Sequence, residues 1–458
     1  MSLPSAPPRG RRTMHIARPV PALRLPERAP VKLLAAVVAA VLAAVLLPAT
    51  PASATKVKVD QRFFGVHDSG LASLSRAGTG SIRLWDTGTL WRDIEVSPGV
   101  YNWTRLDQIV TAAQARNVEV TLVLGMTPSF YASVPTAMPS DPGAFYRYVT
   151  AVVQRYRNWN GKRGIHAYQV WNEANVTNFW TGTTLQMAQL TKATRNAVKA
   201  ADPGAIVVSP AFAARIGEQI RGITKFAFAR VDGVPAWKYA DVLSLNLYPL
   251  PKYGTQVGTP EYSMQLLARA RKILGYGGVP KSKPIWNTEI NYGMQTGSLG
   301  GTKASTISAE RQAAYVIRTY LLNAARGVKR VHWYTYNMGY LASGGTLGNT
   351  LLTKPSDGST LTLAGKAFGL VQQWMKGTLV GPTTSTQPCT VDSKGTYTCV
   401  IKYGQGVRRV YWNPTKRVKV RVAKSATFMV GVYGVRKSVK GGSTKYVDYR
   451  PMMVRSKV

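Results

Sequence analysis

Residues 165–176 read IHAYQVWNEANV, and here an apolar run ends abruptly in an amide and a carboxylate, Asn172 and Glu173. The run has the length and composition of a buried strand. Residues 283–293, KPIWNTEINYG, repeat the arrangement, because a second strand-like run leads into Glu289. The position of these two carboxylates in the fold depends on how many such strands the chain contains and how they are connected.

Eight strand-like segments follow one another between residues 63 and 336. Most are nearly continuous apolar runs, as expected for parallel strands that are covered on both faces. They are Phe63–His67, Ser81–Trp85, Glu119–Leu124, His166–Trp171, Ala205–Ser209, Val242–Leu247, Pro284–Thr288 and Val331–Tyr336.

Amphipathic segments with helical spacing alternate with these strands, at 106–116, 145–159, 185–201, 216–231, 262–274 and 309–326. Eight strands alternating with helices predict an α/β fold, the (β/α)8 TIM barrel. A doubly wound sheet is the rival architecture. It is disfavoured because no glycine-rich phosphate turn opens a helix after the first strand.

The chain changes character after a last helical segment at 363–375. Residues 378–458 consist of short alternating runs separated by glycine and Asn-Pro turns, which is typical of antiparallel strands. We therefore expect a barrel domain at 55–377 and an antiparallel β-sandwich domain at 378–458. In one of these runs the bases Arg417, Lys419 and Arg421 alternate with valines, which places the bases on one exposed face.

The first residues have the layout of a secretory signal peptide. Seven basic residues precede an apolar run that ends before the small residues Ala52-Ser53-Ala54. The run is shorter than the roughly 20 residues of a spanning helix, so we expect cleavage after residue 54 rather than a stable membrane span. An uncleaved anchor is the alternative. Export predicts a secreted or cell-wall-associated protein, and it argues against nucleic acid as a partner.

Net charge and cysteine content are also informative. The chain of 458 residues has a formal net charge of +39, and removal of residues 1–54 leaves about +33. Such a charge favours anionic partners, and for an exported protein these are anionic cell-wall polymers; a solubility adaptation explains it equally well. Export also makes a disulfide between Cys389 and Cys399, the only cysteines, the expected state. Neither these cysteines nor the few histidines have metal-ligand spacing, and we expect neither metal nor cofactor.

Polar residues lie at the carboxyl ends of the predicted strands, which is where a (β/α)8 barrel builds its active site. Two glutamates at two strand ends indicate catalysis more strongly than either one alone, since a single carboxylate there is often a helix cap. The candidate site residues are Glu173 and Glu289 as catalytic groups, with His67, Arg83, Asn172, Asn246, Tyr248 and Trp333 as substrate-binding groups.

The strand-end motifs resemble those of the clan GH-A glycoside hydrolases, in particular families 39 and 5. The resemblance covers roughly residues 60–375 and is carried by SIRLWDTG (81–88), VWNEANV (170–176), NLYP (246–249), PIWNTEINYG (284–293) and VHWYTYN (331–337). The chain departs from the pattern of this clan at the sixth strand, which has Asn246 where many relatives have histidine.

The resemblance implies retaining hydrolysis of O-glycosidic bonds in a polysaccharide or oligosaccharide. Such a reaction needs one carboxylic acid to protonate the leaving oxygen and one carboxylate to trap the oxocarbenium-like centre. Glu173 is expected to be the protonated acid/base, and Glu289 the ionised nucleophile with Arg83 as its cation. Asn172 would bind the sugar 2-hydroxyl, Tyr248 the nucleophile, and Trp333 would stack on the sugar.

A non-catalytic carbohydrate- or cell-wall-binding protein on the same scaffold is the alternative, because a fold alone does not fix function. The presence of both glutamates together with Arg83 favours the enzyme, since a binding protein is free to lose one carboxylate.

Overall fold

The structure is a computed structural model in which residues 53–458 form one compact unit. It describes residues 55–68, 78–249, 258–292, 307–337, 350–382, 385 and 387–457. The expected signal peptide at 1–54 lies outside the described residues. Within the described ranges, no helix combines the length and apolarity needed to cross a membrane.

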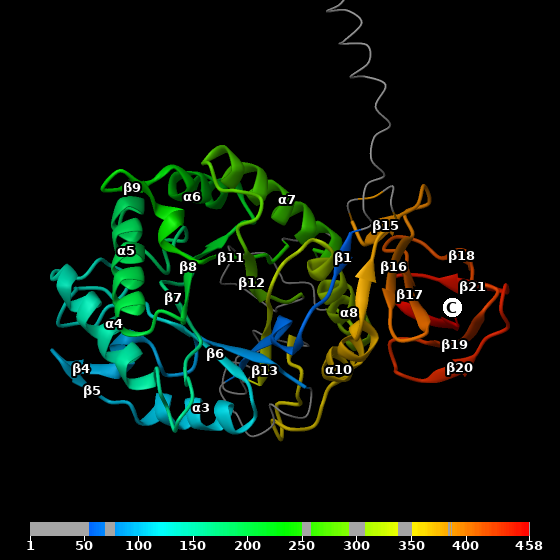
Figure 1. The fold of residues 1–458 in the computed structure, drawn as a ribbon, viewed down its shortest axis with the longest axis horizontal. Helices are drawn as coiled ribbons and strands as arrows, with labels where there is room; N and C mark the ends of the chain where they lie inside the picture. Colours follow the sequence, from blue (N-terminus) through cyan, green and yellow to red (C-terminus); the bar gives the residue numbers. More distant parts are fainter. Residues whose placement is uncertain are drawn as a thin grey trace, which may run out of the picture. The chain divides into compact units, whose positions relative to one another are not determined.

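Eight parallel strands close into a barrel, in which the last strand pairs back onto the first (Figure 1). In barrel order the strands are β2 (Phe64–Asp68), β3 (Ser81–Leu84), β6 (Glu119–Val123), β7 (Ala167–Gln169), β8 (Ile206–Ala213), β11 (Val242–Asn246), β12 (Ile285–Ile290) and β13 (Val331–Asn337). Each overlaps one of the predicted segments, so the predicted (β/α)8 barrel is confirmed.

Helices surround these strands and connect them. They are α2 (Trp91–Ile94), α3 (Thr104–Ala115), α4 (Pro142–Tyr156), α5 (Thr184–Ala201), α6 (Gly217–Phe228), α7 (Pro260–Tyr276), α8 (Ala309–Ala325) and α10 (Leu363–Met375). Short elements fill the connections: η1 (Gln61–Phe63), η3 (Ala236–Tyr239), β4 (Glu95–Ser97), β5 (Val100–Tyr101), β9 (Arg230–Val231) and β10 (Val234–Pro235).

Local sequence explains where several helices begin. Asp141 accepts a hydrogen bond from the backbone of Gly143 at the start of α4, and Pro142 occupies the first turn, where its missing N–H costs nothing. Thr183 and Gln186 form a reciprocal capping box at the start of α5. These caps fix the lengths of the loops that follow β6 and β7, which lie at the end of the barrel where the candidate site is expected.

The C-terminal region forms the predicted antiparallel β-sandwich. Its larger sheet is made of β14 (Thr378–Val380), β15 (Cys389–Val391), β16 (Tyr397–Lys402), β17 (Gly406–Trp412), β19 (Ala426–Val430), β20 (Arg436–Ser438) and β22 (Met452–Lys457), together with β1 (Lys56–Val57). A second ladder pairs β18 (Val418–Arg421) with β21 (Thr444–Val447). A small apolar core that includes Tyr411, Val422, Val447 and Val454 lies between the two. The pairing of β1 with β14 brings the start of the described chain into this region.

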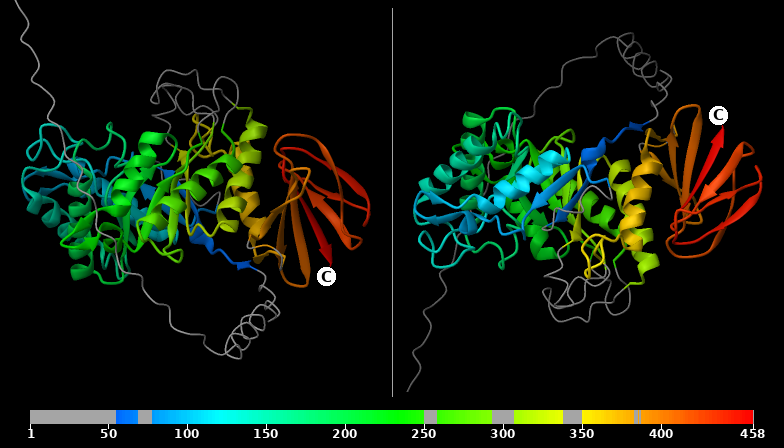
Figure 2. Two further views of the ribbon diagram at one scale, coloured as in Figure 1. Left: turned by 90° about the horizontal axis from the view of Figure 1, so that it is seen from above. Right: turned by 90° about the horizontal axis from the view of Figure 1, so that it is seen from below.

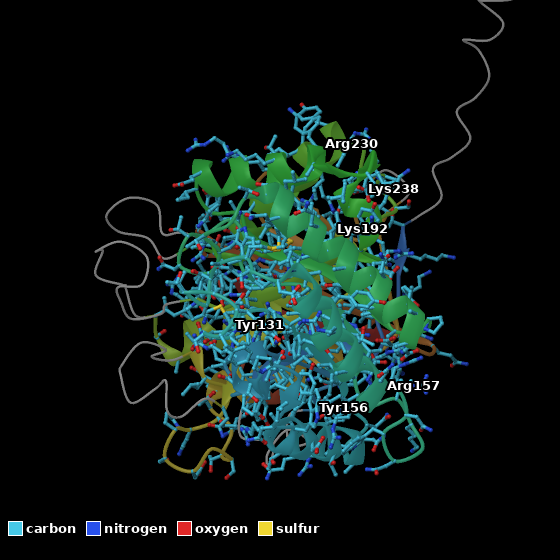
Figure 3. The ribbon with its side chains drawn as sticks, turned by 90° about the vertical axis from the view of Figure 1, so that its left-hand side faces the viewer. Tyr131, Tyr156, Arg157, Lys192, Arg230 and Lys238 are labelled. Atoms are coloured by element: carbon cyan, nitrogen blue, oxygen red, sulfur yellow. A yellow bond between two sulfur atoms is a disulfide. The ribbon has the colours of Figure 1, made fainter. Side chains whose placement is uncertain are left out.

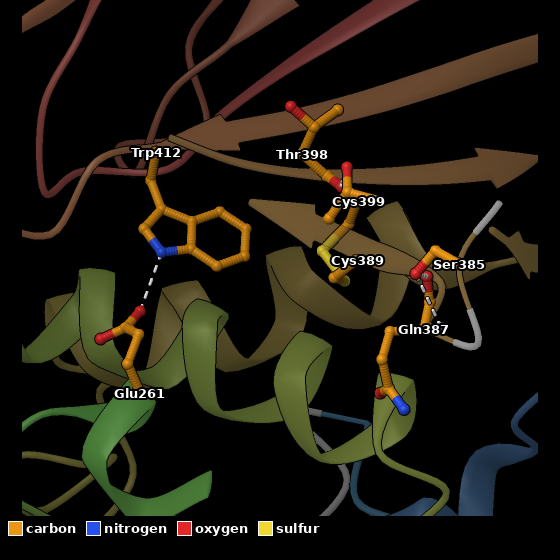
Figure 4. The surroundings of a disulfide bond; sticks show 8 residues. Glu261, Ser385, Gln387, Cys389, Thr398, Cys399 and Trp412 are labelled. Carbon is orange, nitrogen blue, oxygen red and sulfur yellow. Dashed lines mark hydrogen bonds between the residues drawn. A yellow bond between two sulfur atoms is a disulfide. The ribbon is translucent and has the colours of Figure 1, made fainter. Parts of the chain in front are cut away.

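The barrel and the C-terminal sheet share one continuous apolar core, and helices α8 and α10 lie between them (Figure 2). Cys389 and Cys399 are cross-strand partners and form the predicted disulfide (Figure 4). Beside them the Trp412 indole donates a 2.8 Å hydrogen bond from Nε1 to Oε1 of Glu261 on α7. The same carboxylate is ion-paired with the fully buried Arg318 of α8. The sheet is therefore tied to the barrel by polar as well as apolar contacts.

Basic side chains are distributed over the outer surface. Figure 3 shows Arg157, Lys192, Arg230 and Lys238 along the outer side of the barrel near α5. On the second sandwich ladder the bases predicted to face outward, Arg417, Lys419 and Arg421, are exposed, while the alternating valines are at least partly buried. The high charge is thus carried on both the barrel and the sandwich.

Candidate active site

The two glutamates lie at the same end of the barrel. Glu289 belongs to the end of β12, and Glu173 follows β7; they are 6% and 4% exposed. The backbone of Glu173 has a positive φ of 36°, a strained conformation for a residue with a side chain. Two backbone hydrogen bonds hold this turn, from Ala174 to the carbonyl of Ala211 and from Val176 to the carbonyl of Glu173. The end of the fourth barrel strand is therefore a fixed support for the Glu173 side chain.

Arg83 of β3 connects the two strand ends. Its guanidinium is fully buried and donates from Nη1 to Oε1 of Glu289 at 2.6 Å. Nη2 donates to Oδ1 of Asn172 at 2.8 Å, and Nε donates to Oε1 of Gln169 at 2.5 Å. Every nitrogen of the planar fork thus has a fixed partner, which sets the orientation of Glu289 and of the Asn172 amide together.

Glu289 is held on its other oxygen by Tyr248, whose hydroxyl donates to Oε2 at 3.0 Å. Burial raises the pKa of Tyr248 well above its usual value, and the charge of Glu289 raises it further, so the phenol stays a donor. Both oxygens of Glu289 are therefore hydrogen-bonded, which fits the contacts predicted for Arg83 and Tyr248.

The protonation of Glu289 differs from the expectation. Burial raises its pKa to about 7; Arg83 opposes this, while the negative charges of Glu173 and Asp86 add to it. Arg83 was expected to keep this carboxylate charged, but in the free protein the loss of solvation outweighs the ion pair. The raised pKa of Glu289 thus reflects both its burial and the negative charge of Glu173 at the same end of the barrel.

Glu173 has two donors on its Oε1 atom. Asn246 donates from Nδ2 at 3.1 Å, and Arg215 donates from Nη2 at 3.1 Å. Asn246 thus positions the acid/base candidate, and a direct contact of Asn246 with the substrate stays a prediction. Arg215 was not among the predicted site residues. The sequence prediction ends this strand at Ser209, whereas β8 continues to Ala213, and the longer strand brings Arg215 to a strand end, where this fold builds its site.

A directed chain of hydrogen bonds runs beneath the site. Gln169 donates from Nε2 to the Ser244 hydroxyl at 2.7 Å, and Ser244 and Thr288 share a hydrogen bond of 2.5 Å. Thr288 donates to Oδ1 of Asn246 at 2.7 Å, because the amide NH2 of Asn246 faces Glu173. The single hydroxyl proton of Thr288 is used there, so Ser244 must be the donor between the two hydroxyls.

This chain runs in one direction from Arg83 through Gln169, Ser244 and Thr288 to Asn246. It therefore fixes both the rotamers and the amide orientations of the groups that contact Glu173 and Glu289.

His67 lies below the carboxylates. Its Nε2 is 2.9 Å from the carbonyl of Thr288, which can only accept, so Nε2 carries the proton. Burial and the nearby Arg83 lower the pKa of His67 well below its usual value, and the ring is neutral. The ring is fully buried and its Nε2–H is used by the carbonyl of Thr288, so the sugar contact at His67 stays a prediction.

The Trp333 side chain does not face the candidate site. Its ring is 0% exposed, packs against Tyr292 and donates from Nε1 to the carbonyl of Thr350 at 2.8 Å. It points outward from the barrel into the core and offers no face for stacking. The prediction of a sugar platform at Trp333 is therefore wrong.

The next residue, Tyr334, has the opposite orientation. Its hydroxyl donates to Oδ2 of Asp86 at 2.6 Å, and its ring lies edge-on to His67 at 5.0 Å between centroids. Tyr334 is partly exposed, in contrast to its neighbours on either side. The alternation of side chains along a strand could have identified it, since Trp333 and Tyr334 must face opposite ways.

Among the described residues there is no group of three or more histidines, cysteines and carboxylates that could hold a metal ion. The chemistry that these side chains can perform is acid/base and nucleophilic catalysis by two carboxylates with separate hydrogen-bond partners. Arg83, Asn172 and Tyr248 lie where the sequence predicts them around this pair.

Comparison with known proteins gives sequence and fold relationships. No protein-family model matches the chain. A β-xylosidase of Geobacillus stearothermophilus is 28% identical to it over 162 residues, which cover 32% of this chain and 32% of that relative. The match thus spans about a third of the relative's length.

Solved structures resemble the chain over much more of its length. A family 39 glycoside hydrolase from Bacteroides cellulosilyticus WH2 has a TM-score of 0.61 at 15% identity, over 87% of this chain and 82% of that one. A glucosidase from Croceicoccus marinus has a TM-score of 0.60 at 12% identity, over 88% and 98%. A monomeric β-xylosidase from Caulobacter crescentus CB15 has a TM-score of 0.57 at 15% identity, over 88% and 97%. The fold that the resemblance to clan GH-A implies is therefore confirmed, and the chain shares the architecture of these glycoside hydrolases.

Proposed function

We propose that the protein is a retaining glycoside hydrolase that cleaves O-glycosidic bonds of a polysaccharide or oligosaccharide. The observation that carries the proposal is that the two carboxylates have separate hydrogen-bond partners. Glu289 is clamped by Arg83 and Tyr248 through its two oxygens, whereas Glu173 is approached by Asn246 and Arg215. Two interacting carboxylates with separate partners are what a double displacement requires.

In the first step an oxygen of Glu289 attacks the anomeric carbon while Glu173 gives its proton to the departing glycosidic oxygen. The bond from the anomeric carbon to that oxygen breaks, and a covalent glycosyl ester on Glu289 results. In the second step Glu173 takes a proton from water, the water oxygen attacks the anomeric carbon, and Glu289 leaves as a carboxylate. The Asn172 oxygen is occupied by Arg83, so its NH2 group is the donor for the sugar 2-hydroxyl.

A panel of aryl glycosides and polysaccharides tests the proposal, beginning with xylosides because two of the similar proteins are described as β-xylosidases. Glu289→Ala is expected to abolish turnover of every substrate. Glu173→Ala should still form the glycosyl ester from aryl glycosides with good leaving groups, since these need no protonation. Azide should then release a glycosyl azide of retained configuration from this variant.

Asp232→Asn, at an exposed position beyond the C-terminal end of α6, is the control for loss of a carboxylate and should leave turnover unchanged. The alternative, a carbohydrate-binding protein, predicts a different outcome. The wild-type protein would then bind glycans without releasing reducing ends, and Glu289→Ala would bind them equally well. Retained activity in Glu289→Ala would likewise contradict the assigned roles.

Export and docking on anionic cell-wall polymers belong to the same proposal. The Cys389–Cys399 disulfide supports an oxidising compartment, and the exposed bases Arg417, Lys419 and Arg421 support electrostatic docking. Since surface charges are screened beyond about 8–10 Å at physiological salt, retention on insoluble anionic wall material should fall steeply as salt rises. Equal retention at low and high salt would rule the docking out.

A further inference from the structure

Arg215 is a buried cation beside the acid/base candidate. It follows the end of β8, and its side chain is 4% exposed, compared with 6% for the side chain of Glu173. It is therefore about as accessible from solvent as the carboxylate it contacts. An arginine in this environment is uncommon without full compensation of its charge and its donors.

The donors of Arg215 are not fully used. Among the described residues its one side-chain hydrogen bond is the 3.1 Å contact from Nη2 to Oε1 of Glu173. Nε is buried and has no partner in the part of the chain that the structure describes. The guanidinium lies 5.1 Å from the centroid of the Tyr248 ring, which supports it by a cation–π contact. A buried N–H without an acceptor indicates that a further acceptor belongs at this place.

Hydrogen bonds hold the backbone around Arg215. Its own N–H donates to Oε1 of Gln219 at 2.8 Å. Asn175, in the turn after Glu173, forms two hydrogen bonds with Ala213. Nδ2 of Asn175 donates to the carbonyl of Ala213 at 2.8 Å, and the N–H of Ala213 donates to Oδ1 of Asn175 at 3.0 Å. The end of β8 is thus fastened to the turn that carries Glu173. Arg215 is held in place by the fold before any ligand arrives.

The proposed reaction changes the charge balance at this point. Glu173 must be protonated when the glycosidic bond breaks, and it is then no longer an anion that can compensate Arg215. Arg83 is compensated by Glu289, but among the described residues no second carboxylate contacts Arg215. A buried unpaired cation is strongly unfavourable, so an anion from the substrate would restore the balance.

The contact between Arg215 and Glu173 also indicates which sugar of the substrate Arg215 would bind. Glu173 stands beside the departing oxygen, and Glu289 stands at the anomeric carbon. Because Arg215 bonds to Glu173, an anion that it binds lies next to the leaving group. The arginine fork matches the two oxygens of a carboxylate or of a sulfate or phosphate ester.

We propose that Arg215 binds an anionic group, in the first instance the carboxylate of a uronic acid, on the leaving-group sugar of the substrate. This inference rests on the proposed glycosidase function and names the substrate class as an acidic glycan. The net charge of +39 is consistent with it, since a positive field attracts polyanionic chains to the protein.

The test compares two aryl glycosides that differ only in the aglycone, which carries either a carboxylate or the matching carboxamide. The glycosyl group is whichever one the wild-type protein cleaves. The wild type should favour the carboxylate in kcat/KM, and Arg215→Gln should lower that preference by about 100-fold, as expected for removal of one partner of a buried charge pair. Arg215→Lys should keep part of the preference, because it keeps the charge but loses the fork.

Arg221→Gln is the matched control, since it removes one positive charge from the exposed side of α6. It should leave the preference unchanged. Disaccharides with uronic acid, sulfated or neutral sugar at the reducing end, used as substrates, identify the source of the anion. An unchanged preference in Arg215→Gln, with hydrolysis intact, would overturn the inference and leave the proposed function standing.

If the wild type cleaves no glycoside at all, the proposed function fails instead. Calorimetry with the same disaccharides and the Glu289→Gln variant then still measures whether Arg215 selects the acidic sugar. Equal affinity for the uronic acid and neutral disaccharides, or an acidic preference that survives Arg215→Gln, would overturn the inference on its own. A uronic acid preferred only at the non-reducing end would contradict the leaving-group side.

Discussion

Arg83 donates a 2.6 Å hydrogen bond from Nη1 to Oε1 of Glu289, although the two residues are separated by 206 positions in the chain. The guanidinium has no solvent exposure, and its remaining nitrogens are bound to Gln169 and Asn172. This single side chain therefore controls the position of the nucleophile candidate and of the residue that precedes the acid/base candidate.

Replacing Arg83 by lysine should reduce kcat/KM by about 100- to 1000-fold, the usual effect of removing a positioned donor from a transition state. Lysine keeps the charge but cannot reach three partners in one plane. The pKa of Glu289 should also rise above about 7, because the cation that lowers it is less well placed. Kinetics over a range of pH measure both effects.

Arg155→Lys is the matched control for this substitution, since Arg155 forms a two-point contact with Asp107 outside the site, at 2.9 and 2.6 Å. It should leave kcat/KM and its pH dependence unchanged. An Arg83→Lys enzyme with wild-type kinetics would contradict the positioning role.

The pH dependence of kcat/KM should have its acidic limb near pH 7. Burial raises the pKa of Glu289 to about 7, and the carboxylate attacks only when it is ionised, so activity falls as pH drops through that value. Asp86 is one of the charges that raise this pKa. Asp86→Asn removes a negative charge, so the pKa of Glu289 should fall and the limb should move to lower pH.

Asp232→Asn removes an exposed negative charge beyond the C-terminal end of α6, away from the strand ends that carry the two glutamates, and should not move the limb. A limb near pH 4 in the wild type would show that burial does not dominate at Glu289. A limb that moves to higher pH in Asp86→Asn would contradict the electrostatic sign.

The hydrogen-bond chain beneath the site predicts an effect of Thr288→Val, which keeps the shape of the side chain but removes its hydroxyl. Asn246 would lose the donor that fixes its amide orientation, and kcat/KM should fall by about 10-fold, in the range of one lost hydrogen bond. Thr288→Ser should restore most of the activity, because it restores the donor.

Thr191→Val is a suitable comparison, because Thr191 is also fully buried and its hydroxyl donates to the carbonyl of Met187 within α5. Thr191→Val is expected to change only the free energy of unfolding and to leave kcat/KM unchanged. Equal losses in kcat/KM for the two valine variants would mean that Thr288 acts only through stability.

The disulfide should contribute to stability and not to activity. Cys389 and Cys399 are ten residues apart, and closing a loop of that length contributes about 2–3 kcal/mol in the chain-entropy model. The double variant Cys389→Ser/Cys399→Ser should lose about this free energy of unfolding in urea titrations, with kcat/KM unchanged. A fall in kcat/KM in the folded double variant would show that the C-terminal sheet also affects the site.

The sequence by itself predicts the elements and the two glutamates that are the candidate catalytic pair. Continuous apolar runs specify strands that are buried on both faces, and the spacing of apolar residues specifies the helices between them. This is enough to predict the barrel, to place Glu173 and Glu289 at strand ends, and to assign Arg83, Asn172 and Tyr248 near them. The disulfide follows from the expected export and the presence of two cysteines.

Only the tertiary structure decides what each strand-end side chain faces. Trp333 and Tyr334 are adjacent aromatic residues, and closure of the barrel selects Tyr334 for the interior and Trp333 for the surrounding core. Residue type alone made Trp333 the stronger candidate, although the alternation along the strand allows only one of the two to face inward.

The burial and the charge partners of the site residues also depend on strands from the whole barrel. The raised pKa of Glu289 depends on burial by strands from the whole barrel, and the contact between Arg215 and Glu173 joins residues 42 positions apart. Local sequence patterns specify periodicity and therefore elements. Electrostatic environment depends on neighbours that are distant in the chain, and these come together only when the eight strands close.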